Sequence, residues 1–222
     1  MTKKLFTQAI TKFLLGIILV GLLLFLSAGT IFANGVLLMA VLFLPMFFAG
    51  IVMMFKNPEL LKKRLHATEE QQAQRTVVKL SGLMFISGFI VAGLTVRFNW
   101  VALPKGVVIA ATIVFLLGYI LYAEVLRENR YLCRNIVVLE EQKVIDTGLY
   151  GIIRHPMYSA TLLLFLSMPL VLGSLYSFFI FIAYPFIIAK RIMHEEETLE
   201  RELEGYCAYK KKVKYRLIPF VW

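Results

Sequence analysis

Two short segments near the C-terminal end of this 222-residue chain hold the residues whose types and spacing could do chemistry. Residues 146–158 combine two glycines, two tyrosines, an arginine, a histidine and a proline. Residues 190–199 contain Arg191 and Glu195, which are four residues apart and therefore share one face of a helix. A guanidinium can hold a carboxylate, a carboxylate can pair with an ammonium group, and a tyrosine ring attracts a cation. These residue types suit a pocket for a charged organic ligand.

Several other kinds of site are excluded by the sequence. The segment from His194 begins like a zinc-protease helix, but that motif needs a second histidine where Thr198 stands. The three histidines are otherwise far apart and have no cysteine or aspartate cluster beside them, so we expect no metal. The sequence has no Walker loop, Gly-x-Gly-x-x-Gly turn or Gly-x-Ser-x-Gly elbow. We expect the two cysteines, Cys133 and Cys207, to be reduced.

The composition places both segments in a membrane protein of one compact unit. Hydrophobic residues make up 59% of the chain and charged residues 17%, which is too apolar for a soluble domain of this length. The formal net charge is +10, but the basic residues lie in the gaps between apolar runs rather than on one soluble face. Nucleic-acid binding is therefore not expected.

Four apolar runs have the length of about 20 residues that a bilayer requires. They cover residues 13–33, 35–55, 80–96 and 103–125. A fifth stretch, residues 157–189, is too long for one straight span and contains Pro169 and the pair Gly173-Ser174 near its middle. We therefore predict an all-α polytopic membrane protein with four long transmembrane helices, a C-terminal hairpin of two shorter helices and an interfacial C-terminal helix.

The basic residues predict the orientation of these helices. Of the 24 lysines and arginines, all but Arg97 and Lys105 lie in alternate segments that would share one side of the membrane. Short cytoplasmic loops carry the excess of basic residues, so both termini and both chemistry-bearing segments are predicted to be cytoplasmic. The polar stretch between Lys56 and Lys79 shows no assignable site and is expected to be a solvated helical connection.

The start of the hairpin leaves two interpretations open. Pro156 suits the first turn of a helix, so His155 would stand just outside it, beside backbone N–H groups that can receive an anion. Alternatively, Arg154 and His155 are interfacial anchors that touch lipid phosphates, with Tyr150 and Tyr158 in an aromatic belt.

The second segment also allows a structural interpretation. Arg191 and Glu195 could form an ordinary ion pair, and residues 195–197 could be a solvated run of glutamates. Near a membrane exit, however, an uncompensated carboxylate is costly, and a pocket with a cationic ligand would remove that cost. We expect the helix to continue to Val213, with an apolar stripe at the membrane surface formed by Ile192, Leu199, Leu203, Tyr206 and Val213.

These residues resemble the integral-membrane methyltransferases of the isoprenylcysteine carboxyl methyltransferase type, including bacterial and archaeal relatives. The family pattern is Thr-x-Gly-x-Tyr-x-x-x-Arg-His-Pro-x-Tyr, a helical hairpin, Arg-x-x-x-Glu-Glu-x-x-Leu, a Tyr-x-x-Tyr and a basic tail. The matching residues are Thr147, Gly148, Tyr150, Arg154, His155, Pro156, Tyr158, Arg191, Glu195, Glu196, Leu199, Tyr206 and Tyr209. The resemblance covers roughly the last hundred residues, from Glu128 and Asn129 onward.

The resemblance implies transfer of a methyl group from S-adenosylmethionine to a lipophilic, prenylcysteine-like carboxylate, giving a methyl ester. Arg191 would bind the acceptor, and Arg191 and Glu195 would be the catalytic residues. The cofactor pocket would be lined by Gln142, Lys143, Val144, Ile145, Tyr150, His155, Pro156, Met157, Tyr158 and Glu195. Eukaryotic members tend to have histidine in place of Gln142. Residues 127–222 would form the methyltransferase module, and residues 1–126 the transmembrane helices on the acceptor side.

Two rival hypotheses remain. The related phospholipid N-methyltransferases use the same cofactor with an amine acceptor, against which a carboxylate-binding Arg191 argues. The other rival is a non-enzymatic membrane protein in which Arg154, Arg191 and the glutamates form structural ion pairs.

Overall fold

The structure is a computed structural model that describes residues 3–56, 58, 61–62, 65, 72–129, 131–132, 138 and 141–222. Within these residues the chain is all-helical, as predicted, and the only extended pairing is one isolated bridge between Ala102 and Ser174. Most of the predicted connection between Lys56 and Lys79 lies outside the described residues, as does Cys133. In chain order the elements are α1 (Lys3–Gly21), the π-helical η1 (Leu22–Leu26), α2 (Ala33–Lys56), α4 (Gln72–Arg97), α5 (Lys105–Glu128), the 3-10 turn η2 (Gly148–Gly151), α6 (Pro156–Val171), α7 (Leu175–Phe181), α8 (Ala183–Glu202) and α9 (Tyr206–Lys212).

The four predicted long spans are confirmed as helices that are long and apolar enough to cross a bilayer: Leu5–Leu26, Ala33–Lys56, Arg75–Arg97 and Lys105–Glu128. The first lies closer to the N-terminus than the predicted residues 13–33, because Gly29 adopts a left-handed backbone (φ 71°) that closes the helix. On the outer faces, Phe48, Leu83 and Ile120 are each more than 60% exposed. Such apolar faces suit contact with lipid, and the protein is an integral membrane protein.

The predicted hairpin is confirmed, and its turn falls at Gly173 and Ser174. Gly173 has φ 74°, and the Ser174 hydroxyl accepts a hydrogen bond from the backbone N–H of Ser177 at 3.2 Å, which starts α7. The first arm, α6, has 16 residues and is short, as predicted. The second arm is longer than predicted: α7 and α8 together cover the 28 residues Leu175–Glu202, enough to span a membrane. It is longer because α8 stays helical through the charged residues beyond the apolar stretch.

The predicted continuous helix from residue 190 to Val213 is wrong, because α8 ends at Glu202. Gly205 has φ 83°, a left-handed conformation that glycine adopts without strain, and α9 starts directly after it. The residues of the predicted stripe therefore do not lie along one helix at the membrane surface. Instead Leu203, Tyr206, Tyr209 and Val213 are buried together, with Leu199, Val138 and Val144 packed against them.

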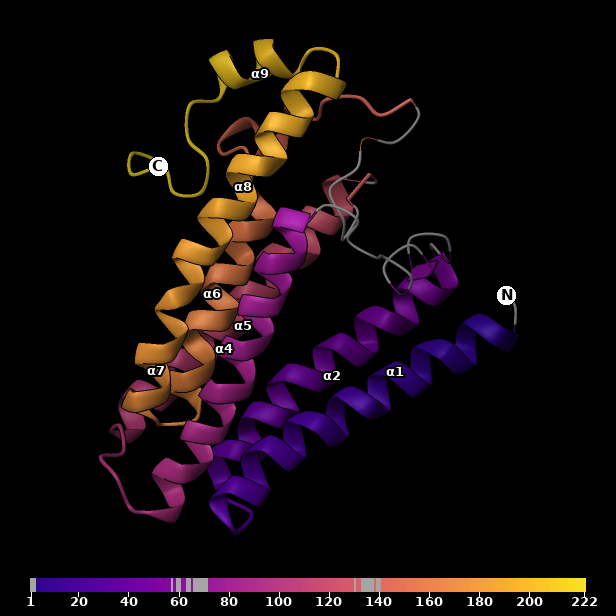
Figure 1. Cartoon of the computed structure of the whole chain (residues 1–222). Helices are drawn as coiled ribbons and strands as arrows, with labels where there is room; N and C mark the ends of the chain where they lie inside the picture. The colour runs from indigo at the N-terminus through magenta and orange to yellow at the C-terminus, as the bar shows by residue number, and fades with distance from the viewer. Residues whose placement is uncertain are drawn as a thin grey trace.

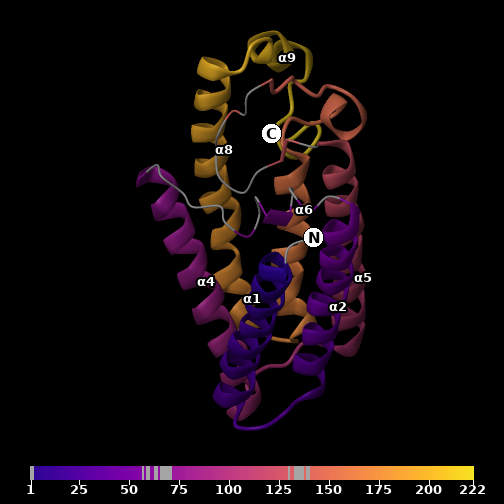
Figure 2. The ribbon, with the colours of Figure 1, turned by 90° about the vertical axis from the view of Figure 1, so that its right-hand side faces the viewer.

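The helices after α2 form the body of the molecule. Helix α6 packs along α5, and α4 packs against α7 and α8. Gly118 permits a close approach of α5 to α6, since a Cβ there would lie 3.0 Å from Leu164. Figure 2 shows α4, α8, α6 and α5 in this order across the bundle. Helices α1 and α2 form a pair that meets this body at the end opposite α9 and diverges from it toward the other end (Figure 1).

The chemistry-bearing segments lie together at one end of the bundle. The turns before α2, before α5 and between α6 and α7 occupy the opposite end, where Asn34 Nδ2 donates to Leu172 O at 3.4 Å and Leu103 N donates to Gly173 O at 2.9 Å. The segments that follow α5 and α8 therefore meet around the start of α6, with α9 above them (Figure 1).

Candidate active site

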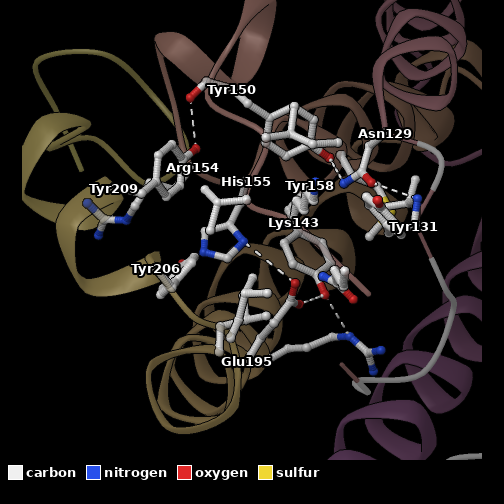
Figure 3. A pocket seen from close by; sticks show the side chains of 18 residues that line it. Asn129, Tyr131, Lys143, Tyr150, Arg154, His155, Tyr158, Glu195, Tyr206 and Tyr209 are labelled. Atoms are coloured by element: carbon white, nitrogen blue, oxygen red, sulfur yellow. Dashed lines mark hydrogen bonds and ion pairs between the residues drawn. The ribbon is translucent and has the colours of Figure 1, made fainter. Parts of the chain in front are cut away.

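A pocket opens where the end of α5, residues 141–155, the start of α6, the last turns of α8 and α9 meet (Figure 3). The predicted site residues that line it are Gln142, Lys143, Val144, Ile145, Tyr150, His155, Met157, Tyr158, Arg191 and Glu195. Pro156 is not among the lining residues: it forms the first residue of α6 and is fully buried. The pocket is also lined by residues that were not predicted to take part in it: Asn129, Tyr131, Leu132, Arg154, Leu199, Leu203, Tyr206 and Tyr209.

The start of α6 has the predicted backbone but is not an open anion site. His155 lies outside the α region (φ −126°, ψ 61°), and Pro156 follows it as the first helical residue. The backbone N–H of His155 donates to Arg216 O at 2.9 Å, and that of Arg154 donates to Tyr215 O at 2.9 Å. The carbonyl of His155 accepts the N–H groups of residues 158 and 159. The C-terminal tail and the helix itself therefore occupy most of the donors that were expected to be free.

Beneath the pocket, Glu196 is the centre of a buried charge cluster. This residue is 2% exposed, and its carboxylate accepts hydrogen bonds from Arg154 Nε at 2.7 Å and from Arg216 Nε at 2.9 Å. His155 Nε2 lies 3.2 Å from the same carboxylate. Arg154 also donates to the carbonyls of Val213 and Lys214, at 2.7 and 2.8 Å. The cluster ties the start of α6, helix α8 and the C-terminal tail together.

Burial settles the alternative interpretation of the first segment. Arg154 and His155 are 6% and 4% exposed and are bound to protein groups, so they are not anchors that touch lipid phosphates. Tyr150 and Tyr158 are also buried, so they do not form an aromatic belt. The alternative of a solvated run of glutamates fits Glu197, which is exposed, but not Glu196, which is buried.

One wall of the pocket carries a hydrogen-bonded chain of three side chains. Arg191 Nε donates to the Tyr158 hydroxyl at 3.0 Å, and this hydroxyl donates to the Glu195 carboxylate. His155 Nδ1 lies 3.9 Å from Glu195. The Glu195 side chain is 23% exposed, so its carboxylate is still within reach of a ligand. Tyr158 thus connects Arg191, which was predicted to bind the acceptor, with Glu195, which was predicted to bind the cofactor.

The opposite wall is held in place by the end of α5. Asn129 Nδ2 donates to the Tyr150 hydroxyl at 2.9 Å, and the Glu128 carboxylate accepts from the N–H of Leu149 at 3.1 Å. Gly148 has φ 50°, and a Cβ there would lie only 1.5 Å from Glu128 Oε1. Burial raises the pKa of the Tyr150 hydroxyl, which therefore stays protonated at neutral pH. These contacts fix the aromatic ring of Tyr150 against the pocket.

Helix α9 covers the pocket. The Tyr209 hydroxyl donates to the carbonyl of Tyr150 at 2.8 Å, and Lys212 Nζ lies 2.7 Å from Asp146. The exposed pair with Lys212 lowers the pKa of Asp146. Val144 packs against the buried side chains of α9, and residues 142–145 line the pocket beside this helix.

Comparison with known proteins gives one match. Residues 106–204, somewhat less than half of the chain, match the family model described as phospholipid methyltransferase. The matched region begins in α5, ends just after α8 and so contains both walls of the pocket. A search of curated proteins finds no significant match. The apolar helices and the family match together indicate an integral-membrane methyltransferase.

Proposed function

We propose that this protein transfers a methyl group from S-adenosylmethionine to the carboxylate of a lipophilic, prenylcysteine-like acceptor. The observation that carries the proposal is the wall formed by Arg191, Tyr158 and Glu195. A cationic group and an anionic group lie one helical turn apart on α8, line the same pocket and are connected through one hydroxyl. This wall lies within the region that matches the methyltransferase family.

The residues present fit the cofactor. Glu195 offers a partly exposed carboxylate to an ammonium group, and Tyr150 and Tyr158 offer aromatic rings to a sulfonium. The hydroxyl of Tyr206 is buried and has no partner among the described residues, so the pocket has a polar atom left for a ligand. S-adenosylmethionine would supply a methyl group that forms a bond to an acceptor oxygen, while the electron pair of the broken carbon–sulfur bond stays on sulfur.

Arg191 would position the acceptor. A carboxylate is already ionised at neutral pH, so its methylation requires alignment and removal of water rather than a strong base. Arg191 is 9% exposed, and a guanidinium in such a setting holds a carboxylate more strongly than it would in water. We expect the pocket to lie where the helices leave the bilayer, so that a lipophilic acceptor enters from the membrane and the cofactor from the aqueous side.

The second candidate is methylation of the amino group of a phospholipid, which the description of the matched family favours. An ammonium group must lose a proton before it can accept a methyl group, so this reaction needs a base as well as alignment. The position of Arg191, a cation, against the pocket favours the carboxylate over the amine.

Methyl transfer from radiolabelled S-adenosylmethionine to N-acetyl-S-farnesylcysteine and to phosphatidylethanolamine tests the choice. We expect base-labile methyl ester from the first acceptor and no product from the second. Arg191→Ala should lower ester formation by about a hundredfold while cofactor binding is retained. Lys190→Ala, which removes an exposed cation next in sequence, is the matched control and should leave the rate unchanged. Base-stable product on phosphatidylethanolamine alone would contradict the carboxylate acceptor, and no product with either would favour a non-enzymatic protein.

A further inference from the structure

The hydroxyl of Tyr206 stands apart from the other polar groups of the pocket. Tyr206 is 4% exposed and lines the pocket, and its hydroxyl has no hydrogen-bond partner among the described residues. A buried hydroxyl without a partner lowers stability, because it loses its hydrogen bond to water and gains none in return. Such a group is expected to have a partner in the working protein, and a bound ligand is the partner that a pocket supplies.

Its neighbour on α9 provides the contrast. Tyr209 lies three residues further on and points its hydroxyl at the backbone carbonyl of Tyr150, 2.8 Å away (Figure 3). The two rings lie 5.7 Å apart and belong to the same buried cluster. The Tyr209 hydroxyl therefore stabilises the fold, whereas the Tyr206 hydroxyl remains available to a ligand in the pocket. The left-handed turn at Gly205 places both rings there.

Charged groups surround the Tyr206 hydroxyl. Burial is the main reason that the pKa of the Tyr206 hydroxyl is raised, and the nearby carboxylates of Glu196 and Glu195 raise it further. At neutral pH this hydroxyl therefore keeps its proton and is a neutral donor. The Arg154 side chain donates to Glu196 and to backbone carbonyls of the tail. Glu195 is partly exposed and lines the same pocket. This part of the pocket thus offers a hydroxyl donor close to a reachable carboxylate.

An α-amino acid group carries an ammonium and a carboxylate on one carbon and needs this combination of partners. We infer that the Tyr206 hydroxyl donates a hydrogen bond to the carboxylate at the amino-acid end of the cofactor, while Glu195 accepts from the ammonium. The inference rests on the proposed function. It assigns α9 a direct part in recognising the ligand.

Calorimetry with two ligands tests this assignment in the detergent-purified full chain. S-adenosylhomocysteine carries the amino-acid end, and 5′-methylthioadenosine lacks it. Tyr206→Phe should weaken binding of S-adenosylhomocysteine by about tenfold, as expected for a lost hydrogen bond to a charged group, and leave binding of 5′-methylthioadenosine unchanged. The melting temperature of the Tyr206→Phe variant should not fall, because the substitution removes a hydroxyl that has no partner among the described residues.

Tyr209→Phe is the matched control. It should lower the melting temperature, because the bond to the Tyr150 carbonyl is lost, and should keep the wild-type ratio of the two affinities. Equal affinity of Tyr206→Phe and wild type for S-adenosylhomocysteine would overturn the inference, and so would an equal loss for both ligands. A wild-type protein that binds neither ligand would instead overturn the proposed function on which the inference rests.

Discussion

Two neighbouring glutamates on α8 lie in different surroundings because successive helical residues point about 100° apart. Glu196 is buried against two arginine side chains and the imidazole of His155, whereas the Glu195 side chain faces the pocket and is 23% exposed. A run of three glutamates in a sequence does not reveal this division. It depends on which side of α8 meets the start of α6 and the C-terminal tail.

At the residue scale, we predict that Glu196→Gln strongly destabilises the protein. The substitution leaves the buried guanidinium of Arg154 without its counter-charge, which costs about 3 to 5 kcal/mol. Unfolding in mixed detergent micelles, followed by circular dichroism, measures the loss. Glu197→Gln changes the exposed neighbour and should have little effect. Equal stability of the two variants would show that the cluster does not hold the tail in place.

The sequence identified the residues of one wall but not all of the partners that hold the pocket. Arg191, Glu195 and Tyr158 belong to spaced motifs and could be predicted. Asn129 could not, because its contact with Tyr150 depends on where α5 ends and on a turn that brings back a residue 21 positions later. Arg154 and His155 were found by the motif, but their main partner, Glu196, comes from a different helix.

At the scale of elements, apolar runs and turn residues predicted the spans and the hairpin, but not the end of α8. The spacing of the apolar residues from Ile192 to Val213 fits a single helix, so periodicity alone gave no sign of a break. Gly205 was the available signal, since a glycine with a left-handed backbone commonly ends a helix. Leu199, Leu203, Tyr206 and Val213 do pack together, but against Val138 and Val144 rather than against lipid.

The contact between α5 and the turn η2 gives a second prediction. Gly148→Ala would place a Cβ 1.5 Å from Glu128 Oε1 at a residue with φ 50°, so the carboxylate must leave the Leu149 N–H. We expect a lower melting temperature and weaker cofactor binding. Gly82→Ala in α4, where a Cβ meets nothing within 4 Å, is the control and should be neutral or stabilising by about 0.5 to 1 kcal/mol. Normal ligand affinity in Gly148→Ala would contradict the positioning of Tyr150 by this turn.

At the scale of the whole molecule, the distribution of basic residues predicts a cytoplasmic pocket. All but two of the 24 lysines and arginines lie in alternate segments of the sequence, and these include both segments that form the pocket. Cys207 in α9 is exposed and is a natural reporter of that side. With Cys133 replaced by serine, a membrane-impermeant maleimide should label Cys207 in inverted vesicles and not in intact cells. Labelling of Cys207 from outside intact cells would show that the orientation is the reverse of the predicted one.

Binding of S-adenosylhomocysteine to the detergent-purified protein, measured by calorimetry, tests the central claim most directly. We predict micromolar affinity for the wild type and for Glu197→Gln, and a loss of at least about tenfold in Glu195→Gln, because a charge-assisted bond to the ligand is removed. Absence of binding in several detergents and lipids, or equal affinity in Glu195→Gln, would contradict a cofactor site in this pocket.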